Sequence, residues 1–255
     1  MKTLDCSTIE STQNSLISLF KTDLDGLNKF LLACNEKITF NNGIKDCSLT
    51  FNDILTYFQL DNEEVLPDRI TMFHLSSSVD DSSFKEHGLL NLENVIKKGL
   101  LNEFFLKNGI KIVYKEGVAP IITYKNKDYT DEHLFWRFNQ DKCINGFLIR
   151  EMAECNSNVQ HLKKCPEFIH DLSRLLTNPD LVSNWIKENK RIKLSLSVDF
   201  KDLNNYDADI LIVGAVEYLV LKSKELWSSG DNYMVYLDED VNILPSDILR
   251  IEVQK

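Results

Sequence analysis

The chain has 255 residues, which is typical of one large domain or two small ones, and its hydrophobic fraction of 43% excludes a disordered chain. Glycine (9) and proline (5) are too scarce for a collagen-like or low-complexity protein. The 39 acidic and 29 basic residues give a net charge of −10, so the overall field of the chain repels nucleic acid.

The start of the chain and its apolar segments predict a cytoplasmic protein. Residues 1–5 are polar and no apolar signal-peptide core follows them. No apolar run approaches the roughly 18 residues of a membrane-spanning helix, so we expect no membrane contact. The six cysteines are scattered and form no CxxC pair, which favours reduced thiols.

The first quarter of the chain is predicted to be helical. Apolar residues recur at helical spacing over 8–36, with a break expected near Asp25-Gly26. A second helix is predicted over 50–58, with Thr50 as its N-cap. The acidic stretch 61–68 contains Pro67 and is the best boundary in the chain. We therefore expect a helical N-terminal segment, 1–66, packed on an α+β body, 67–255, as one compact unit.

The body is predicted to begin with a strand over 69–75 and a polar loop over 76–83. The helices that follow are expected at 89–98, 100–107, 167–176, 179–185 and 209–227. The remaining strands are expected at 110–114, 121–124, 143–149, 191–200, 233–237 and 248–253. The strand 191–200 alternates apolar and polar residues, which predicts one buried and one solvated face. Most helices come early and several strands late, which favours α+β with a mixed or antiparallel sheet and flanking helices.

One segment of the body resembles a known family. Phe73-His74-Leu75-Ser76 is followed by a polar stretch, then by Gly88-Leu89 and an apolar helix. This order is similar to the opening of the ADP-ribosyltransferase-like fold, whose members often begin with a His-x-Thr/Ser element. The acidic turn 238–245, which ends in proline before the last strand, resembles the turn that bears the catalytic acid in that family.

The resemblance implies a set of site residues. His74 and Ser76 would hold NAD, through the ribose next to nicotinamide and through the amide. Either Glu239 or Asp240 would be the catalytic acid. Either Tyr114 or Tyr124 would be the tyrosine of the site. The chemistry is reasonable, because cleavage of NAD at the nicotinamide bond creates a positive charge that a nearby carboxylate stabilises.

Other kinds of site are weaker in this sequence. Cys155, His161, Cys165 and His170 lie close together, but their spacing is looser than that of structural zinc sites, so we expect no metal. Asp80-Asp81 precedes two serines and is better explained by helix capping than by cation binding. G-x-S-x-G, Walker A and G-x-G-x-x-G motifs are absent from the sequence.

The sequence therefore leaves three functions open. The first is an intracellular ADP-ribosyltransferase-like enzyme that uses NAD and an unknown macromolecular acceptor, of the toxin or phage-defence type. The alternative is a non-catalytic interaction protein of a bacterial or phage system, whose acidic surface meets a basic protein partner. The third is a metal-independent ribonuclease that uses His74 with a second histidine.

Overall fold

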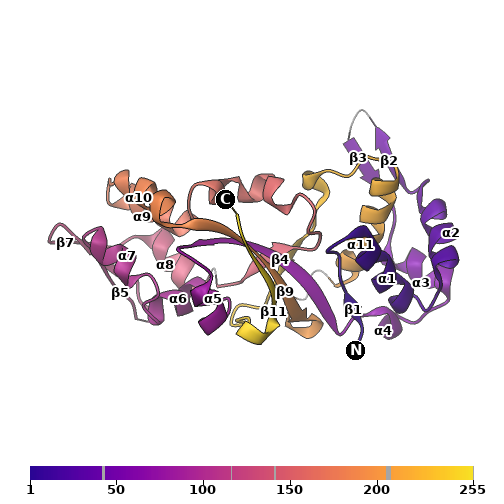
Figure 1. The fold of residues 1–255 in the computed structure, drawn as a ribbon, viewed down its shortest axis with the longest axis horizontal. Coiled ribbons are helices and arrows are strands. Elements are labelled where there is room, and N and C mark those ends of the chain that lie inside the picture. The colour runs from indigo at the N-terminus through magenta and orange to yellow at the C-terminus, as the bar shows by residue number, and fades with distance from the viewer. Residues whose placement is uncertain (42–43, 116, 141, 205–207, 255) are drawn as a thin grey trace. The chain divides into compact units, whose positions relative to one another are not determined.

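The computed structural model describes residues 1–41, 44–115, 117–140, 142–204 and 208–254 (Figure 1). The fold is α+β, as the sequence predicts: helices accompany sheets in which most of the described strand pairs are antiparallel and one, formed by residues 3–4 and 69–70, is parallel. The chain divides into two compact units, each built from three separate stretches. The first unit comprises Met1–Phe73, Asn145–Ser157 and Leu196–Tyr236, and the second comprises His74–Ile144, Asn158–Ser195 and Leu237–Lys255.

The predicted segment 1–66 lies entirely within the first unit, whereas the range 67–255 contributes to both units. The segment is mainly helical but also contains a short first strand and a hairpin. The helices of the first unit are α1 (Ile9–Leu19), α2 (Leu24–Cys34), α3 (Phe51–Phe58), α4 (Asn62–Val65) and α11 (Ala208–Ser223). Its own strands are β1 (Thr3–Leu4), β2 (Ile38–Asn41), β3 (Ile44–Cys47), β8 (Asn145–Phe147) and β10 (Met234–Tyr236).

Helix α11 is the centre of the first unit, and α1, α2 and α3 pack against it. Its sequence is apolar on all sides, and its side chains from Leu211 to Leu221 are mostly buried. A helix that is apolar all round needs neighbours on every side. The prediction of a largely buried helix in this region is therefore confirmed.

The predicted long helix 8–36 is two helices, and the break lies earlier than the sequence suggests. Helix α1 ends at Leu19, and Asp23 caps the start of α2 by accepting a hydrogen bond from the Gly26 backbone (2.7 Å). Gly26 therefore lies inside the first turn of α2. Asp23 is the N-cap that starts α2, and Gly26, three residues later, does not end a helix.

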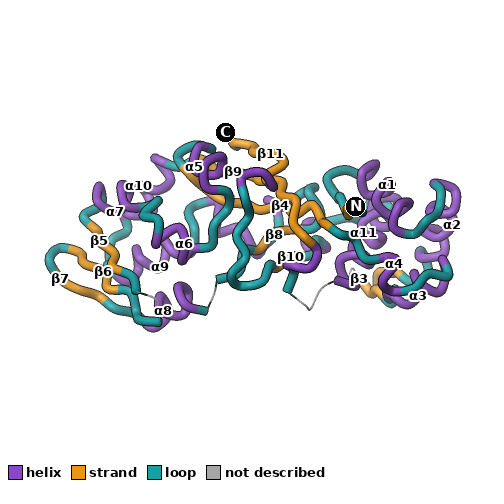
Figure 2. The backbone as a smooth tube through the Cα atoms, turned by 90° about the horizontal axis from the view of Figure 1, so that it is seen from below, coloured by secondary structure: helices purple, strands orange, loops and turns teal. Residues whose placement is uncertain are grey.

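The second unit contains most of the short helices and a small sheet. Its helices are α5 (Ser82–His87), α6 (Leu92–Lys97), α7 (Asn102–Lys107), α8 (Glu132–Asn139), α9 (Glu167–Leu175) and α10 (Asp180–Glu188). Its own strands are β5 (Ile110–Val113), β6 (Ile121–Tyr124), β7 (Lys127–Tyr129) and β11 (Ile248–Val253). Strands β5, β6 and β7 form an antiparallel sheet (Figure 2), which includes the predicted pairing of 110–114 with 121–124.

One face of this small sheet covers the core of the second unit. Ile110 and Ile122 are buried against helices α7 to α10, together with the aromatic rings of Phe105, Phe138 and Phe168. Phe138 and Phe168 meet edge to face at 5.3 Å between ring centroids. Such contacts add to the free energy gained from burial of the rings.

Strands β4 (Arg69–Ser78) and β9 (Lys190–Asp199) each contribute residues to both units. The hydrogen-bonded strand order is β10-β8-β4-β9-β11, with β1 also paired with β4. Strand β4 is longer than predicted, because residues 76–78 continue the strand instead of starting a loop. In β9 both Lys193 and Ser195 are buried, so the prediction of a solvated face is wrong there. Ile192, Leu194 and Leu196 on the opposite face are buried as well, so both faces of this part of the strand are covered.

No helix within the described ranges is long and apolar enough to cross a membrane.

The capping box at the start of α3 yields the first prediction. Thr50 Oγ1 accepts a hydrogen bond from the Asp53 backbone (3.3 Å), and Asp53 Oδ2 accepts one from the Thr50 backbone (2.8 Å). We expect Thr50→Ala to lower the free energy of unfolding by about 1 kcal/mol. Thr56→Ala, an exposed site in the same helix, is the matched control and should have little effect. Equal losses in urea denaturation of the two variants would contradict the capping role.

Candidate active site

Two segments that are far apart in the sequence meet at the start of α6. Leu89 and Ile243 exchange backbone hydrogen bonds of 3.0 and 2.9 Å and form an isolated antiparallel bridge. Gly88, just before the bridge, has φ +76° and ψ −160°, a conformation that only glycine adopts readily. A Cβ atom at this position would overlap the carbonyl oxygen of Ile243. Gly88 is therefore needed both for its backbone conformation and for the close approach of the two segments.

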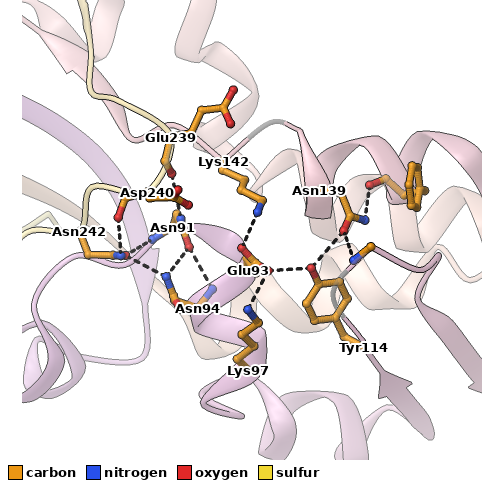
Figure 3. Close-up of polar contacts among 12 residues, drawn as sticks. Asn91, Glu93, Asn94, Lys97, Tyr114, Asn139, Lys142, Glu239, Asp240 and Asn242 are labelled. Carbon is orange, nitrogen blue, oxygen red and sulfur yellow. Dashed lines mark hydrogen bonds and ion pairs between the residues drawn. The ribbon is translucent and has the colours of Figure 1, made fainter. Parts of the chain in front are cut away.

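Asn91 links α6 to the acidic turn. Its side chain is buried and caps α6 by accepting a hydrogen bond from the Asn94 backbone (3.0 Å). Its amide nitrogen donates to the backbone oxygen of Glu239 (3.3 Å), and its own backbone N–H donates to Asn242 Oδ1 (2.9 Å). Figure 3 shows these contacts. They hold the turn through backbone and amide groups, so the carboxylates of Glu239 and Asp240 stay exposed.

Glu93 lies in the first turn of α6 and is buried, with 5% of its surface exposed. Lys97 Nζ lies 2.8 Å and Lys142 Nζ 3.0 Å from its oxygens, and the Tyr114 hydroxyl donates to it at 2.7 Å (Figure 3). Burial alone would raise the pKa of Glu93, but the hydrogen bonds from Lys97, Tyr114 and Lys142 lower it to about 2. Glu93 is therefore an anion with charged and hydrogen-bonding partners.

Asn139 extends this cluster beyond Tyr114. Its Oδ1 lies 3.2 Å from the Tyr114 hydroxyl and accepts a hydrogen bond from the Gly117 backbone (3.0 Å). Its Nδ2 donates to the carbonyl of Phe135 (2.9 Å), one turn earlier in α8. Helix α8 thus positions the tyrosine hydroxyl against Glu93.

The structure brings some of the predicted site residues together. The segment 91–97 contacts both Tyr114 and the turn that carries Glu239 and Asp240. Figure 3 shows the Glu239 carboxylate pointing away from the Asn91 amide that holds its backbone.

Tyr124 lies at the other end of the β5–β6 pairing from Tyr114. Tyr124 pairs with Ile110 at one end of the two strands. Tyr114 comes directly after Val113, which pairs with Ile121 at the other end. The ammonium group of Lys125 lies 4.9 Å from the centre of the Tyr124 ring. The two tyrosines that the sequence left as alternatives are therefore in different surroundings, and only Tyr114 joins the Glu93 cluster.

His74 and Ser76 are on β4, in the part of the strand that belongs to the second unit, and both are half-buried. The next residue, Ser77, accepts a hydrogen bond from the indole nitrogen of Trp185 (3.0 Å), which ties this end of β4 to α10. The predicted NAD-holding residues thus lie on a regular strand, and the polar loop follows them.

Sequence reasoning missed Asn91, Glu93, Asn139 and Lys142. Glu93 and Lys97 are spaced as a helical ion pair, which was the one local signal. The pair Asp80-Asp81 is predicted to cap a helix. Asp81 is the N-cap residue of α5 but makes no side-chain capping bond, whereas the Asp80 carboxylate accepts hydrogen bonds from the Ser82 backbone (2.9 Å) and hydroxyl (2.5 Å). Within the part of the chain that the structure describes, no group of three or more His, Cys, Asp and Glu side chains could hold a metal ion.

Comparisons with known proteins found no matching family model, no matching curated protein and no matching solved structure.

The close approach at Gly88 can be tested by substitution. Gly88→Ala should lower the free energy of unfolding by about 2 kcal/mol or more, because it adds backbone strain and an overlap with Ile243. Gly109→Ala is the matched control, since Gly109 has φ +70° but open space around it, and should cost only about 1 kcal/mol. Urea denaturation measures both, and equal losses would contradict the close approach.

The lowered pKa of Glu93 makes its contribution to stability depend on pH. A carboxylate with a folded pKa of about 2 and an unfolded pKa near 4.5 stabilises the fold fully above pH 4.5, and this part is lost as pH falls towards 2. The shift corresponds to about 3 kcal/mol. We expect Glu93→Gln to be destabilised by that order at pH 7 and by much less near pH 3. The exposed Glu103→Gln is the control and should stay within about 0.5 kcal/mol of the wild type at both pH values. A pH-independent loss for Glu93→Gln would contradict this assignment.

Proposed function

We propose that this chain is an ADP-ribosyltransferase-like enzyme that uses NAD and transfers ADP-ribose to a macromolecular acceptor in the cytoplasm, as a toxin or phage-defence component. The main support is the junction of the two segments that carry the resemblance. Asn91 donates to the backbone oxygen of Glu239 across 148 residues of sequence, and Leu89 pairs with Ile243. Contact between two such distant segments is what a shared site requires.

The proposed reaction needs a carboxylate near the nicotinamide ribose. The bond between the ribose carbon and the nicotinamide nitrogen breaks, and nicotinamide leaves with the electron pair. The acceptor forms a new bond to that carbon and releases its proton to water. Positive charge develops on the ribose in between, and a fixed carboxylate stabilises it. Glu239 and Asp240 fit this role, because the turn is held by Asn91 and Asn242 while both carboxylates are exposed.

Binding of NAD is assigned to His74 and Ser76 on β4, with one tyrosine. An imidazole donates to a ribose hydroxyl, and a serine hydroxyl bonds the carboxamide. Tyr114 is favoured over Tyr124, because its hydroxyl contacts Glu93, two residues after the asparagine that holds the acidic turn.

A second candidate is the interaction protein with a basic partner. The observation that favours it is the run Asp238-Glu239-Asp240, whose three side chains are all exposed in one turn. Opposite charges across an interface speed association and suppress wrong partners. Under this reading the same carboxylates would bind lysines or arginines of the partner and no NAD would be consumed.

A nicotinamide-release assay separates the two functions. With radiolabelled NAD and a cell extract as the source of acceptor, the wild type should release nicotinamide and transfer label. His74→Ala and one of Glu239→Gln and Asp240→Asn should each lower the rate by about 100-fold. Glu103→Gln, an exposed acid on α7, is the control and should keep the full rate.

Absence of both nicotinamide release and NAD binding in the folded wild type would refute the enzyme. Loss of release only in Glu239→Gln or only in Asp240→Asn would decide which carboxylate acts. If instead both acidic variants lost a basic partner while NAD stayed intact, the interaction protein would be supported.

A further inference from the structure

Strand β11 is the last strand in the order β10-β8-β4-β9-β11, so one of its edges has no strand partner among the described residues; this is called its free edge. Figure 2 shows it beside β9. The Gln254 backbone N–H donates to the Arg191 carbonyl of β9 (2.9 Å). Because backbone groups alternate along a strand, those of residues 250 and 252 also face β9. The N–H and C=O groups of Leu249, Ile251 and Val253 then point to the free edge.

This edge strand contains no proline, and its two charged residues, Arg250 and Glu252, are of opposite sign. Proline, a bulge or a covering element normally protects an edge strand. Leu249 is 59% and Val253 44% exposed. Exposed apolar side chains on an open edge are characteristic of a strand that pairs with a partner.

We propose that β11 pairs with β11 of a second copy of this chain, antiparallel and with Ile251 on the two-fold axis. In this register Leu249 faces Val253 of the second copy, and Ile251 faces its own counterpart. Each facing pair then exchanges both backbone hydrogen bonds. Arg250 faces Glu252 of the second copy, so opposite charges meet twice across the axis.

The sequence of the strand supports a second copy over an unrelated peptide. Leu249-Arg250-Ile251-Glu252-Val253 is complementary to itself when reversed about Ile251: apolar residues meet apolar ones, and the basic residue meets the acidic one. A shift of one residue would put Arg250 opposite Ile251 and lose this match. Arg250 and Glu252 already lie on the same face of the strand, 2.8 Å apart within one chain, and so can exchange partners across the axis.

A groove with a mixed polar and apolar lining lies beside the strand. It has a volume of about 430 Å³ and lies between α5 and the chain from Pro245 to Ile251. Phe84, Pro245, Ile248 and Leu249 contribute its apolar side chains, and Asp81 and Lys85 form an ion pair at its border (2.7 Å). The second copy therefore has a surface to pack on beyond the strand itself.

Charge exchange within the strand provides a direct test. Sedimentation velocity of the wild type from about 2 to about 200 µM, in 0.15 M salt to screen the repulsion between two acidic copies, should show a concentration-dependent dimer. Arg250→Glu alone and Glu252→Arg alone would each place like charges opposite one another and weaken the dimer at least about tenfold. Lys111→Glu, a charge reversal on the exposed side of β5, is the matched control and should dimerise like the wild type.

The decisive step is to mix the two single variants. One copy then presents two acids and the other two bases, so a heterodimer should form with an affinity within about threefold of the wild type. The double variant Arg250→Glu/Glu252→Arg should dimerise alone for the same reason. Thermal unfolding curves verify that each variant is folded, and Leu249→Asp should weaken every one of these dimers.

Each outcome decides the proposal. Recovery of the dimer on mixing supports both the β11 interface and its register. A wild type that stays monomeric at the highest concentration refutes the proposal. A dimer that persists in both single variants, or single variants that fail to recover on mixing, would place any self-association elsewhere. The test is independent of NAD, so failure of the proposed function leaves it intact.

Discussion

The buried carboxylate of Glu93 imposes the strongest local constraint on the second unit. Burial of an ionised carboxylate without partners would cost a large free energy of desolvation, so the fold must bring cations to it. It does so from two places: Lys97 one turn along the same helix, and Lys142 from the chain before β8. The Tyr114 hydroxyl supplies the third contact. One charge thus joins α6, the end of β5 and the chain after α8, and the acidic turn rests on the same helix through Asn91.

The first unit contains a similar arrangement around Glu217 of α11, whose side chain is completely buried. Lys45 of β3 lies 2.8 Å from one oxygen, and the Tyr233 hydroxyl donates to the other at 2.5 Å. Burial and the hydrogen bond to Glu217 both raise the pKa of Tyr233, so its proton stays in place. Gly214 leaves room for this ring, since a Cβ there would lie 2.6 Å from it. In both units lysine and tyrosine side chains contact the buried acid: Lys97, Lys142 and Tyr114 at Glu93, and Lys45 and Tyr233 at Glu217.

Local signals were sufficient for much of the secondary structure. Thr50 marks the start of α3 through hydrogen bonds with Asp53, three positions away, and α11 is recognisable from its largely apolar composition. The strand pattern of β9 was recognisable too, but not its environment. Alternation predicted a solvated face, yet Lys193 and Ser195 are buried because other parts of the chain cover them. Burial of a polar residue depends on what folds over it, which its own segment does not encode.

The same limit explains how little of the candidate site was predictable. His74, Ser76, Glu239 and Asp240 were singled out from two short segments, and neither segment encodes which groups hold the acidic turn in place. Asn91 and Asn242 tie that turn to the start of α6, because their amide groups both donate and accept hydrogen bonds.

This choice of partner has a chemical consequence. Lysines bound to the carboxylates of the acidic turn would neutralise them. The amides of Asn91 and Asn242 instead donate to the backbone oxygens of Glu239 and Asp240, so they fix the turn without pairing with its carboxylates. Both proposed functions need a turn whose backbone is held in place and whose carboxylates remain available to a ligand. They differ in what meets the carboxylates: a positive charge that develops during a reaction, or one that a protein partner already carries.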